Sequence, residues 1–319
     1  MKEIIIYGIT AAFFFSSTFA INRWLNEVGH WYWTATLRYI YVFIFLSLIL
    51  VFCYRWNFYK ETIKCFYTFR YFWFFAGGIG FGVFYLLLCF AASYSAGWVL
   101  ATTWQITILM SPLVILLLGS KVPFRGISYL IIMFLGILLV NHEEFLSFSL
   151  IDLKSVIPIS IAAFCYPFGN TLCKYASEGK FGKFRIDKFS VAKNVFSQMI
   201  MMTLGAAPIL IICGIFVSPP PPTINQLYYT AIIGLFTGVI ATALLYIARQ
   251  QSKNNPFALA AADGTQAGEP PLALFWEHAL FNQVLPSITS ISGLAFVIIG
   301  ILFFYKSNVT IENSNSEQK

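Results

Sequence analysis

Charged residues are scarce in this chain. Only 10% of its 319 residues are Asp, Glu, Lys or Arg, whereas 59% are hydrophobic, and the mean hydropathy is +0.76. Soluble domains carry about 25% charged residues, so this chain has less than half of the usual solubilising surface. This composition excludes a soluble enzyme, a disordered protein and a nucleic-acid-binding protein. The net charge of +7 does not indicate phosphate contacts, because basic cytoplasmic loops give membrane proteins the same excess.

Paired cysteines and nucleotide-binding motifs are also lacking. The six cysteines show no CxxC spacing and most lie in apolar runs, which favours small buried side chains over a disulfide framework or a zinc site. The glycine-rich stretch 77–82 lacks the Lys and the strand–turn–helix context of a phosphate-binding loop, so we interpret it as a site of close helix packing. His30, His142 and His278 fall in predicted outer loops and are not spaced as ligands on one helix. We therefore expect no metal and no cofactor.

What the sequence does contain is a series of apolar runs. A helix of about 20 apolar residues crosses a bilayer core of about 30 Å. Runs read between charged residues and Pro or Gly breaks predict an all-α membrane protein with ten transmembrane helices, and no tail or loop is long enough for a soluble domain. The predicted spans, one to ten, are approximately 4–22, 31–53, 71–93, 97–118, 126–141, 155–176, 192–217, 227–248, 256–276 and 285–305.

The positions of Lys and Arg orient these spans. With a cytoplasmic N-terminus, 17 of the 20 basic residues fall on the cytoplasmic side, Arg23 and Lys154 fall on the outer side, and Arg38 lies within span two. This asymmetry predicts that both termini are cytoplasmic and that the protein lies in the cytoplasmic membrane of the cell. In the alternative, residues 1–20 are a cleaved signal peptide, which would leave nine spans. The match of this segment to a later one favours a retained helix.

Segments of the first half of the chain have counterparts in the second half. Their common order predicts a five-helix repeat, and an odd number of crossings per unit forces the two units into opposite orientations. Inverted repeats are typical of secondary transporters. The matching segments are 10–23 with 161–174, 134–140 with 298–304, and Pro112 with Pro270. The predicted units are 1–141 and 155–305, with an outer connecting loop at 142–154 and a cytoplasmic tail at 306–319.

Three short motifs carry a resemblance to a known family. They are Thr34-Ala-Thr-Leu-Arg38-Tyr39 in span two, Phe90-Ala-Ala-Ser-Tyr-Ser-Ala-Gly-Trp98 leading into Ser111-Pro112, and Asp263-Gly-Thr-Gln-Ala-Gly-Glu-Pro270 in span nine. Over essentially its full length, the chain resembles the drug/metabolite transporter superfamily in its ten-helix, EamA-like form. The last motif resembles the multidrug resistance efflux transporter branch, which implies efflux of a drug or metabolite.

The chain departs from its relatives in one respect. The four-helix small multidrug transporters carry a proton-coupling Glu in their first helix. Here spans one and six contain no acidic residue beyond Glu3 at the membrane edge. Any proton coupling must therefore use another carboxylate.

Ionisable residues within the spans are the first functional candidates, because they are costly in hydrocarbon. They are Arg38, Asp263 and Glu269. At about 1.5 Å per residue, Arg38 lies roughly 10 Å below the outer face and Glu269 roughly 20 Å above the inner face, which is nearly the same level in a core of about 30 Å. We predict that both face a central cavity, near enough to interact. Glu269 and Asp263 are the predicted proton-coupling residues, and Arg38 is a partner or a clamp for an anionic group.

Polar and aromatic residues near this level complete the predicted site. Gln105, Gln266 and Trp104 are expected to contact the substrate, and Tyr166 adds a second flat ring. Such rings suit amphipathic or cationic organic solutes. In the structural alternatives, Arg38 snorkels to the outer interface or only locks helix packing, an Arg38–Glu269 pair is static, and Asp263 is hydrated near the inner surface.

These features predict a secondary active transporter that moves a small organic solute by alternating access, and the family resemblance implies that it exports the solute. It is expected not to be an enzyme. Expected partners are the solute, membrane lipid and protons as a candidate coupling ion, with no nucleic acid; monomer and homodimer both stay open. One alternative is an amino-acid or metabolite uniporter or exchanger without proton coupling. More remote alternatives are an integral-membrane lipid-modifying enzyme and a structural or sensory membrane protein.

Overall fold

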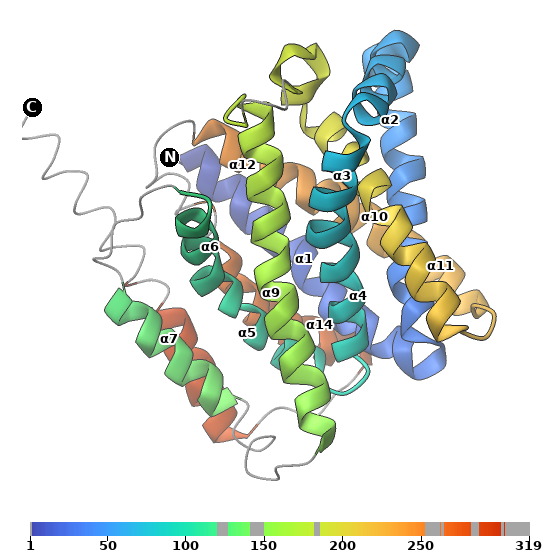
Figure 1. Ribbon diagram of the computed structural model, residues 1–319. Coiled ribbons are helices and arrows are strands. Elements are labelled where there is room, and N and C mark those ends of the chain that lie inside the picture. The colour runs from blue at the N-terminus through green and yellow to red at the C-terminus, as the bar shows by residue number, and fades with distance from the viewer. Residues whose placement is uncertain are drawn as a thin grey trace, which may run out of the picture.

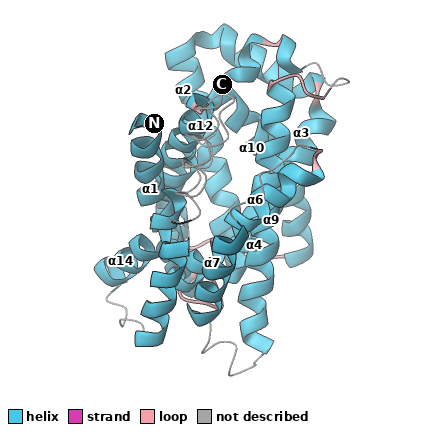
Figure 2. Ribbon diagram, turned by 90° about the vertical axis from the view of Figure 1, so that its left-hand side faces the viewer, coloured by secondary structure: helices cyan, strands magenta, loops and turns pink. Residues whose placement is uncertain are grey.

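The computed structural model describes residues 2–119, 127–140, 150–181, 186–252, 262, 265–281, 287–300 and 303. Throughout these ranges the regular structure is helical, with no strand, and the long helices run side by side as a bundle (Figures 1 and 2). The first half contains α1 (Lys2–Val28), α2 (Trp31–Thr68), α3 (Arg70–Gly77), the π-helix η1 (Gly78–Val83), α4 (Phe84–Ala91), α5 (Gly97–Trp104), α6 (Ile106–Leu117) and α7 (Ile127–Val140).

The second half begins with α9 (Leu150–Ser177), whose first turns lie inside the segment 142–154 that was predicted as a connecting loop. The other elements are the 3-10 helices η3 (Ile186–Lys188) and η4 (Ser190–Lys193), α10 (Val195–Val217), α11 (Ile224–Ile233), the π-helix η5 (Gly234–Ala241), α12 (Thr242–Gln251), the 3-10 helix η6 (Thr265–Gly268) and α14 (Glu269–Phe281). A further apolar helix covers Ile288–Gly300.

Seven helical stretches of the described part are long and apolar enough to cross a membrane. They coincide with predicted spans one to four and six to eight. In the places of spans five and ten, α7 and the helix Ile288–Gly300 are shorter. The all-helical architecture is thus confirmed for the described ranges, whereas the count of ten spans stays a prediction. The seven stretches are Lys2–Val28, Trp31–Thr68, Arg70–Ala91, Gly97–Leu117, Leu153–Ser177, Val195–Val217 and Ile224–Gln251.

α2 extends well beyond the predicted span 31–53. The backbone breaks at Arg55, with φ 73° and ψ 156°, and then continues as helix to Thr68. In this second segment Thr62 and Cys65 are buried, while Lys64 is exposed. The Thr62 and Ser197 hydroxyls lie 3.0 Å apart, so the segment packs its buried face on the start of α10. An amphipathic helix, rather than an open loop, therefore connects spans two and three.

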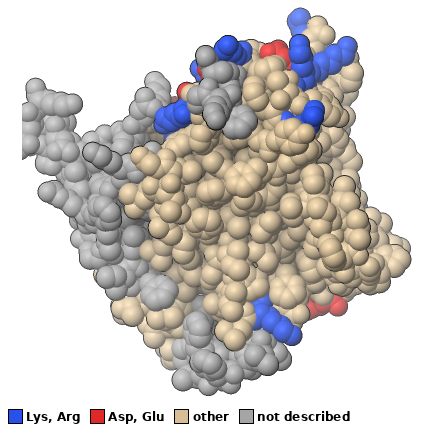
Figure 3. Space-filling model, viewed as in Figure 1, with Lys and Arg blue, Asp and Glu red and all other residues tan. Residues whose placement is uncertain are grey.

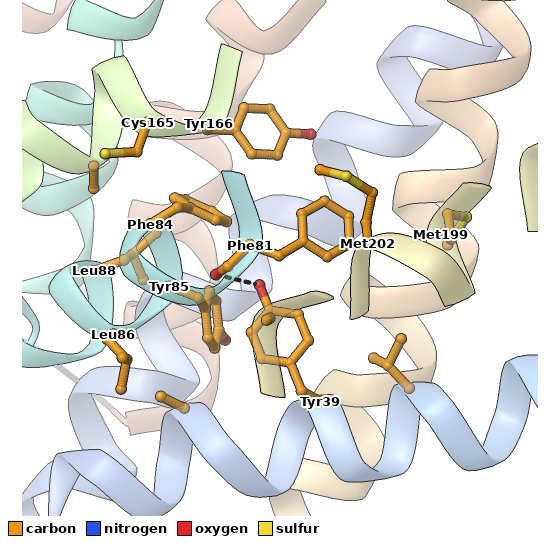
Figure 4. Packing of buried hydrophobic residues seen from close by; sticks show 14 of the residues in the cluster. Tyr39, Phe81, Phe84, Tyr85, Leu86, Leu88, Cys165, Tyr166, Met199 and Met202 are labelled. Carbon is orange, nitrogen blue, oxygen red and sulfur yellow. Dashed lines mark hydrogen bonds between the residues drawn. The ribbon is translucent and has the colours of Figure 1, made fainter. Parts of the chain in front are cut away.

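Two of the crossing stretches contain a π-helix in the middle. η1 joins α3 to α4 and packs against α10, whereas η5 joins α11 to α12 and packs against α2. A π-helix is uncommon, and such segments are frequent at functional sites. Side-chain hydroxyls bond their carbonyls: Tyr39 donates to Phe81 O at 2.8 Å (Figure 4) and Thr242 donates to Thr237 O at 2.9 Å.

Close backbone contact explains the glycine-rich stretch 77–82. A Cβ at Gly80 would lie 2.6 Å from the Cα of Gly169, and a Cβ at Gly169 would lie 2.3 Å from the Cα of Gly80. No larger residue fits at either position unless η1 and α9 move apart. The interpretation of this stretch as a helix-packing site is confirmed.

Charge is concentrated at one end of the bundle. Figure 3 shows a wide band without charged side chains, with Lys and Arg gathered above it. We call the end that carries Lys64, Lys174, Lys193 and Arg249 the basic end. At the opposite end, Lys154 Nζ lies 5.4 Å from the centroid of the Tyr94 ring. Exposed apolar side chains in the band between the two ends suit contact with lipid.

Candidate functional site

A small cavity lies inside the bundle, lined by residues of α1, α2, η1, α4, α5, α9, η5, α12, η6 and α14. Its volume is about 50 Å³, which has room for a few water molecules but is far below the 300 Å³ or so of sites for organic ligands. The structure therefore shows this central cavity in a closed form. The residues predicted from the sequence that line it are Arg38, Trp104, Tyr166, Gln266 and Glu269.

Arg38 lies on the second turn of α2, which starts where the ring nitrogen of His30 accepts a hydrogen bond from Tyr32 N at 3.3 Å. The Arg38 side chain is 6% exposed. Its Nε donates to Thr237 Oγ1 at 3.3 Å, and its guanidinium carbon lies 4.0 Å from the centroid of the Tyr85 ring. A desolvated cation over an aromatic face gains about 2 kcal/mol. The guanidinium is thus stabilised by a hydroxyl and by rings.

Glu269 is the first residue of α14 and directly follows the 3-10 turn η6. Pro270 and Pro271 occupy the first helical turn, where the missing N–H needs no partner, so they start the helix rather than kink it. The predicted span 256–276 has Glu269 and both prolines in its interior. The structure instead places the break before Glu269.

The Glu269 side chain is 2% exposed, and its Oε2 atom has no hydrogen-bond partner. Buried polar atoms are nearly always paired, so an orphan of this kind marks a candidate functional group. Within the part of the chain described here, no ion pair forms between Arg38 and Glu269, although both line the cavity. The predicted interaction between these two residues is therefore absent from the closed form.

Three aromatic rings form one side of the central cavity. The ring centroids of Phe84 and Tyr166 are 4.8 Å apart, those of Phe84 and Trp104 are 5.2 Å apart, and those of Trp104 and Tyr166 are 5.6 Å apart. They come from α4, α5 and α9, so three helices build this aromatic cluster. Figure 4 shows Phe84 and Tyr166 beside Phe81 of η1.

The other predicted residues lie differently. Gln105 is 1% exposed but is not one of the cavity-lining residues; its Nε2 donates to Ala101 O at 3.2 Å, and it lies at the break between α5 and α6. Its amide is therefore used within its own helix. Gln266 lines the cavity from η6, with Nε2 3.5 Å from Thr265 Oγ1. Asp263 lies outside the described residues.

A buried polar cluster beside Arg38 was missed by the sequence reasoning. Asn22 Nδ2 donates to the Tyr85 hydroxyl at 3.0 Å, and the Thr18 hydroxyl lies 3.2 Å from the Tyr85 hydroxyl and 3.4 Å from Thr237 Oγ1. This cluster connects α1, α4 and η5. The one available signal was an Asn inside an apolar span.

Glu277 was also missed. It is 3% exposed, and its two carboxylate oxygens accept hydrogen bonds from Gly97 N at 2.7 Å and Trp98 N at 3.0 Å. These N–H groups begin α5, and Ala96 before them has no side chain that can cap the helix. α14 therefore carries two buried carboxyl groups: Glu277 is bonded at both oxygens, whereas Glu269 has an orphan oxygen.

The predicted placement of the three histidines in outer loops needs one correction. His278 lies within α14 and not in an outer loop, while His30 precedes α2 and His142 is outside the described residues. Burial lowers the pKa of His30. Among the described residues no group of three or more His, Cys, Asp or Glu side chains is arranged to hold a metal ion.

Long apolar helices that enclose a cavity lined by buried ionisable groups define a multi-pass membrane protein of the transporter class. The chain belongs to the EmrE family: residues 1–310 match its family model, which is described as "Putative multidrug resistance efflux transporter". The resemblance inferred from the motifs in spans two, four and nine is thereby confirmed.

The chain is also similar to individual proteins. It is 33% identical over 324 residues to "Uncharacterized protein YjlA" of Bacillus subtilis (strain 168), an alignment that covers 95% of this chain and 94% of that protein. It is 30% identical over 305 residues to "Uncharacterized 42.1 kDa protein in intracellular alkaline protease 3'region" of Shouchella clausii, which covers 92% and 76% of the two chains. A solved structure described as "Crystal structure of protein" has a TM-score of 0.62 and 11% identity over 97% of this chain and 98% of its own, which shows the fold alone.

Proposed function

We propose that this protein is a secondary active transporter that exports a small organic solute from the cytoplasm by alternating access, with Glu269 as its proton-coupling group. Membership of the EmrE family supports transport of small solutes. The single observation that carries the proton-coupling proposal is the orphan Oε2 of Glu269 in the central cavity. An unpaired charge in hydrocarbon is costly, so this carboxyl is suited to hold a proton when the cavity is closed and to release it when water enters.

The packing of the helices supports two inverted five-helix repeats. η1 of span three packs on α10 of span seven, and η5 of span eight packs on α2 of span two. Likewise, α1 of span one packs on α14 of span nine, and α9 of span six packs on α6 of span four. If each span is replaced by the span five positions away in the chain, the contact between spans three and seven becomes that between eight and two, and the contact between one and nine becomes that between six and four. Such pairs are expected where two halves exchange conformations to open the two sides in turn.

The π-helices are our candidates for the segments that change shape. They occupy corresponding positions in spans three and eight, and they line the central cavity through Phe81 of η1 and Gly238 of η5. The closed cavity is too small for an organic solute, so the surrounding helices must separate during transport. The aromatic cluster of Phe84, Trp104 and Tyr166 would then contact the apolar part of the solute. By the positive-inside rule, the basic end and both termini face the cytoplasm.

The test uses purified protein in sealed vesicles that contain a pH-sensitive dye. Cationic, zwitterionic and anionic solutes are added outside, and the interior pH is followed for the wild-type protein, Glu269→Gln and Glu277→Gln. We expect one solute class to drive a pH change that is lost in Glu269→Gln and kept in Glu277→Gln. Tracer flux of the same solute without any pH change would contradict proton coupling and indicate a uniporter or exchanger. A pH response that survives in Glu269→Gln would refute the role of this residue.

A further inference from the structure

A second cavity is larger than the central cavity. It has a volume of about 340 Å³ and lies at the basic end, between α6, α9, α10 and α12. We call it the vestibule. Its volume falls within the range of about 300–1,000 Å³ that is typical of sites for organic ligands.

Among the described residues that line the vestibule, basic side chains outnumber acidic ones. Lys174, Lys193 and Arg249 line it, and the acidic residue among its described lining residues is Glu178. The Glu178 carboxylate is already paired with Lys180, at 2.8 Å between Oε2 and Nζ. The positive-inside rule explains basic residues on cytoplasmic loops, but it does not require them to surround a cavity.

An orphan donor in the vestibule is independent of these charges. Asn170 lines the vestibule and is 6% exposed. Its Oδ1 accepts a hydrogen bond from the Tyr246 hydroxyl, whereas its Nδ2 has no hydrogen-bond partner. A buried amide N–H₂ without an acceptor, in a cavity lined by three basic side chains and one carboxylate, fits a ligand rich in acceptor oxygens.

The vestibule adjoins the central cavity. On α9, Tyr166 lines the central cavity and Asn170, one helical turn further on, lines the vestibule. On α12, Thr242 lines the central cavity and Tyr246, one helical turn further on, lines the vestibule. The hydrogen bond between Tyr246 and Asn170 therefore lies on the vestibule side of the boundary between the two cavities.

We propose that the vestibule binds the anionic group of the transported solute, a carboxylate or a phosphate ester, on its way between the cytoplasm and the central cavity. Carboxylate and phosphate oxygens accept charge-assisted hydrogen bonds from Lys and Arg and satisfy the Asn170 amide. This inference rests on the proposed function, and it assigns the solute to the organic anions or zwitterions rather than to the simple cations.

The test measures binding by calorimetry in nanodiscs of neutral phosphatidylcholine. Benzoate and benzylammonium have the same ring and opposite charge, and inorganic phosphate is the third probe. The variants are Lys193→Gln, Arg249→Gln and Asn170→Asp. Lys64→Gln is the control, because it removes an exposed charge at the same end that does not line the vestibule.

We expect benzoate and phosphate to bind, with affinities that fall about tenfold or more in Lys193→Gln and Arg249→Gln and stay unchanged in Lys64→Gln. Asn170→Asp keeps an acceptor for Tyr246 but replaces the donor with a negative charge. It should therefore lower benzoate affinity and raise benzylammonium affinity. Lys193 is exposed, so its variant is expected to fold, and the reversal in Asn170→Asp is not explained by a general loss of structure.

Flux measurements on the same variants separate this inference from the proposed function. Flux of benzylammonium that depends on Glu269, without any binding of benzoate or phosphate, would overturn the anion site and leave the transporter proposal standing. Anion binding that is lost in the variants, without flux of any probe, would support the site and refute transport. If neither anion binds, but phosphatidylglycerol stays bound to the wild-type protein and not to Lys193→Gln, the vestibule is a lipid headgroup site and the solute assignment is wrong.

Discussion

Glu269→Gln and Glu277→Gln remove one acidic group each from the same helix, and we expect opposite consequences. Both side chains are buried, at 2% and 3% exposed, so exposure does not distinguish them. Their partners do. Glu277 accepts two backbone hydrogen bonds at the start of α5, whereas Oε2 of Glu269 accepts none.

The magnitudes follow from these partners. A Gln at position 277 has one acceptor oxygen, so its NH₂ group would face one of the two N–H donors. Losing one hydrogen bond to a charged group costs about 1.5–3 kcal/mol of unfolding free energy. A Gln at position 269 breaks no hydrogen bond at Oε2 and removes a group that is costly when ionised. We expect the stability of this variant to be unchanged or higher by up to about 1 kcal/mol.

The assay is thermal unfolding of the purified proteins in one detergent, followed by tryptophan fluorescence, together with solute-driven proton flux in vesicles. Glu3→Gln, at an exposed position, is the control for removal of a negative charge. Glu277→Gln should melt earlier and keep coupling, whereas Glu269→Gln should melt no earlier than the wild-type protein and lose coupling. A lower stability of Glu269→Gln than of Glu277→Gln, or an equal loss of proton flux in both variants, would contradict these roles.

Three further predictions concern packing, the polar cluster and the aromatic cluster. Gly80→Ala should destabilise the protein by about 1–3 kcal/mol, because its Cβ meets the backbone of α9. In the control Gly268→Ala, the Cβ meets among the described residues only Leu272, at 3.7 Å; equal melting temperatures would contradict the Gly80 contact. Tyr85→Phe should cost about 1–3 kcal/mol, since Asn22 loses a buried partner, and it should keep solute affinity because the ring beside Arg38 remains; this is checked by melting and by solute binding. Trp104→Ala should weaken solute binding at least about tenfold, whereas Trp56→Ala, an exposed control, should not; equal affinities would exclude the aromatic cluster from the binding site.

The candidate site was predictable in part, because depth in a membrane depends only on the rise per residue along a helix. This is why Arg38 and Glu269 could be placed at one level, and the structure finds both at the central cavity. The face that a helix turns toward its neighbours was less predictable. Trp104 and Gln105 are adjacent in the chain, yet Trp104 lines the cavity while the Gln105 side chain bonds within its own helix.

The class of the protein can be recognised from hydropathy, the scarcity of charge and the basic asymmetry, because these reflect how each segment interacts with lipid and water independently of the others. Which side chains come into contact depends on how the helices pack and cannot be read from single segments. Glu277 finds its partners 180 residues away in the chain at Gly97, and the vestibule forms where four separate helices come together. The unpaired atoms of Asn170 and Glu269 can likewise be recognised only in the folded structure, because a missing hydrogen-bond partner shows only when every neighbour is in place.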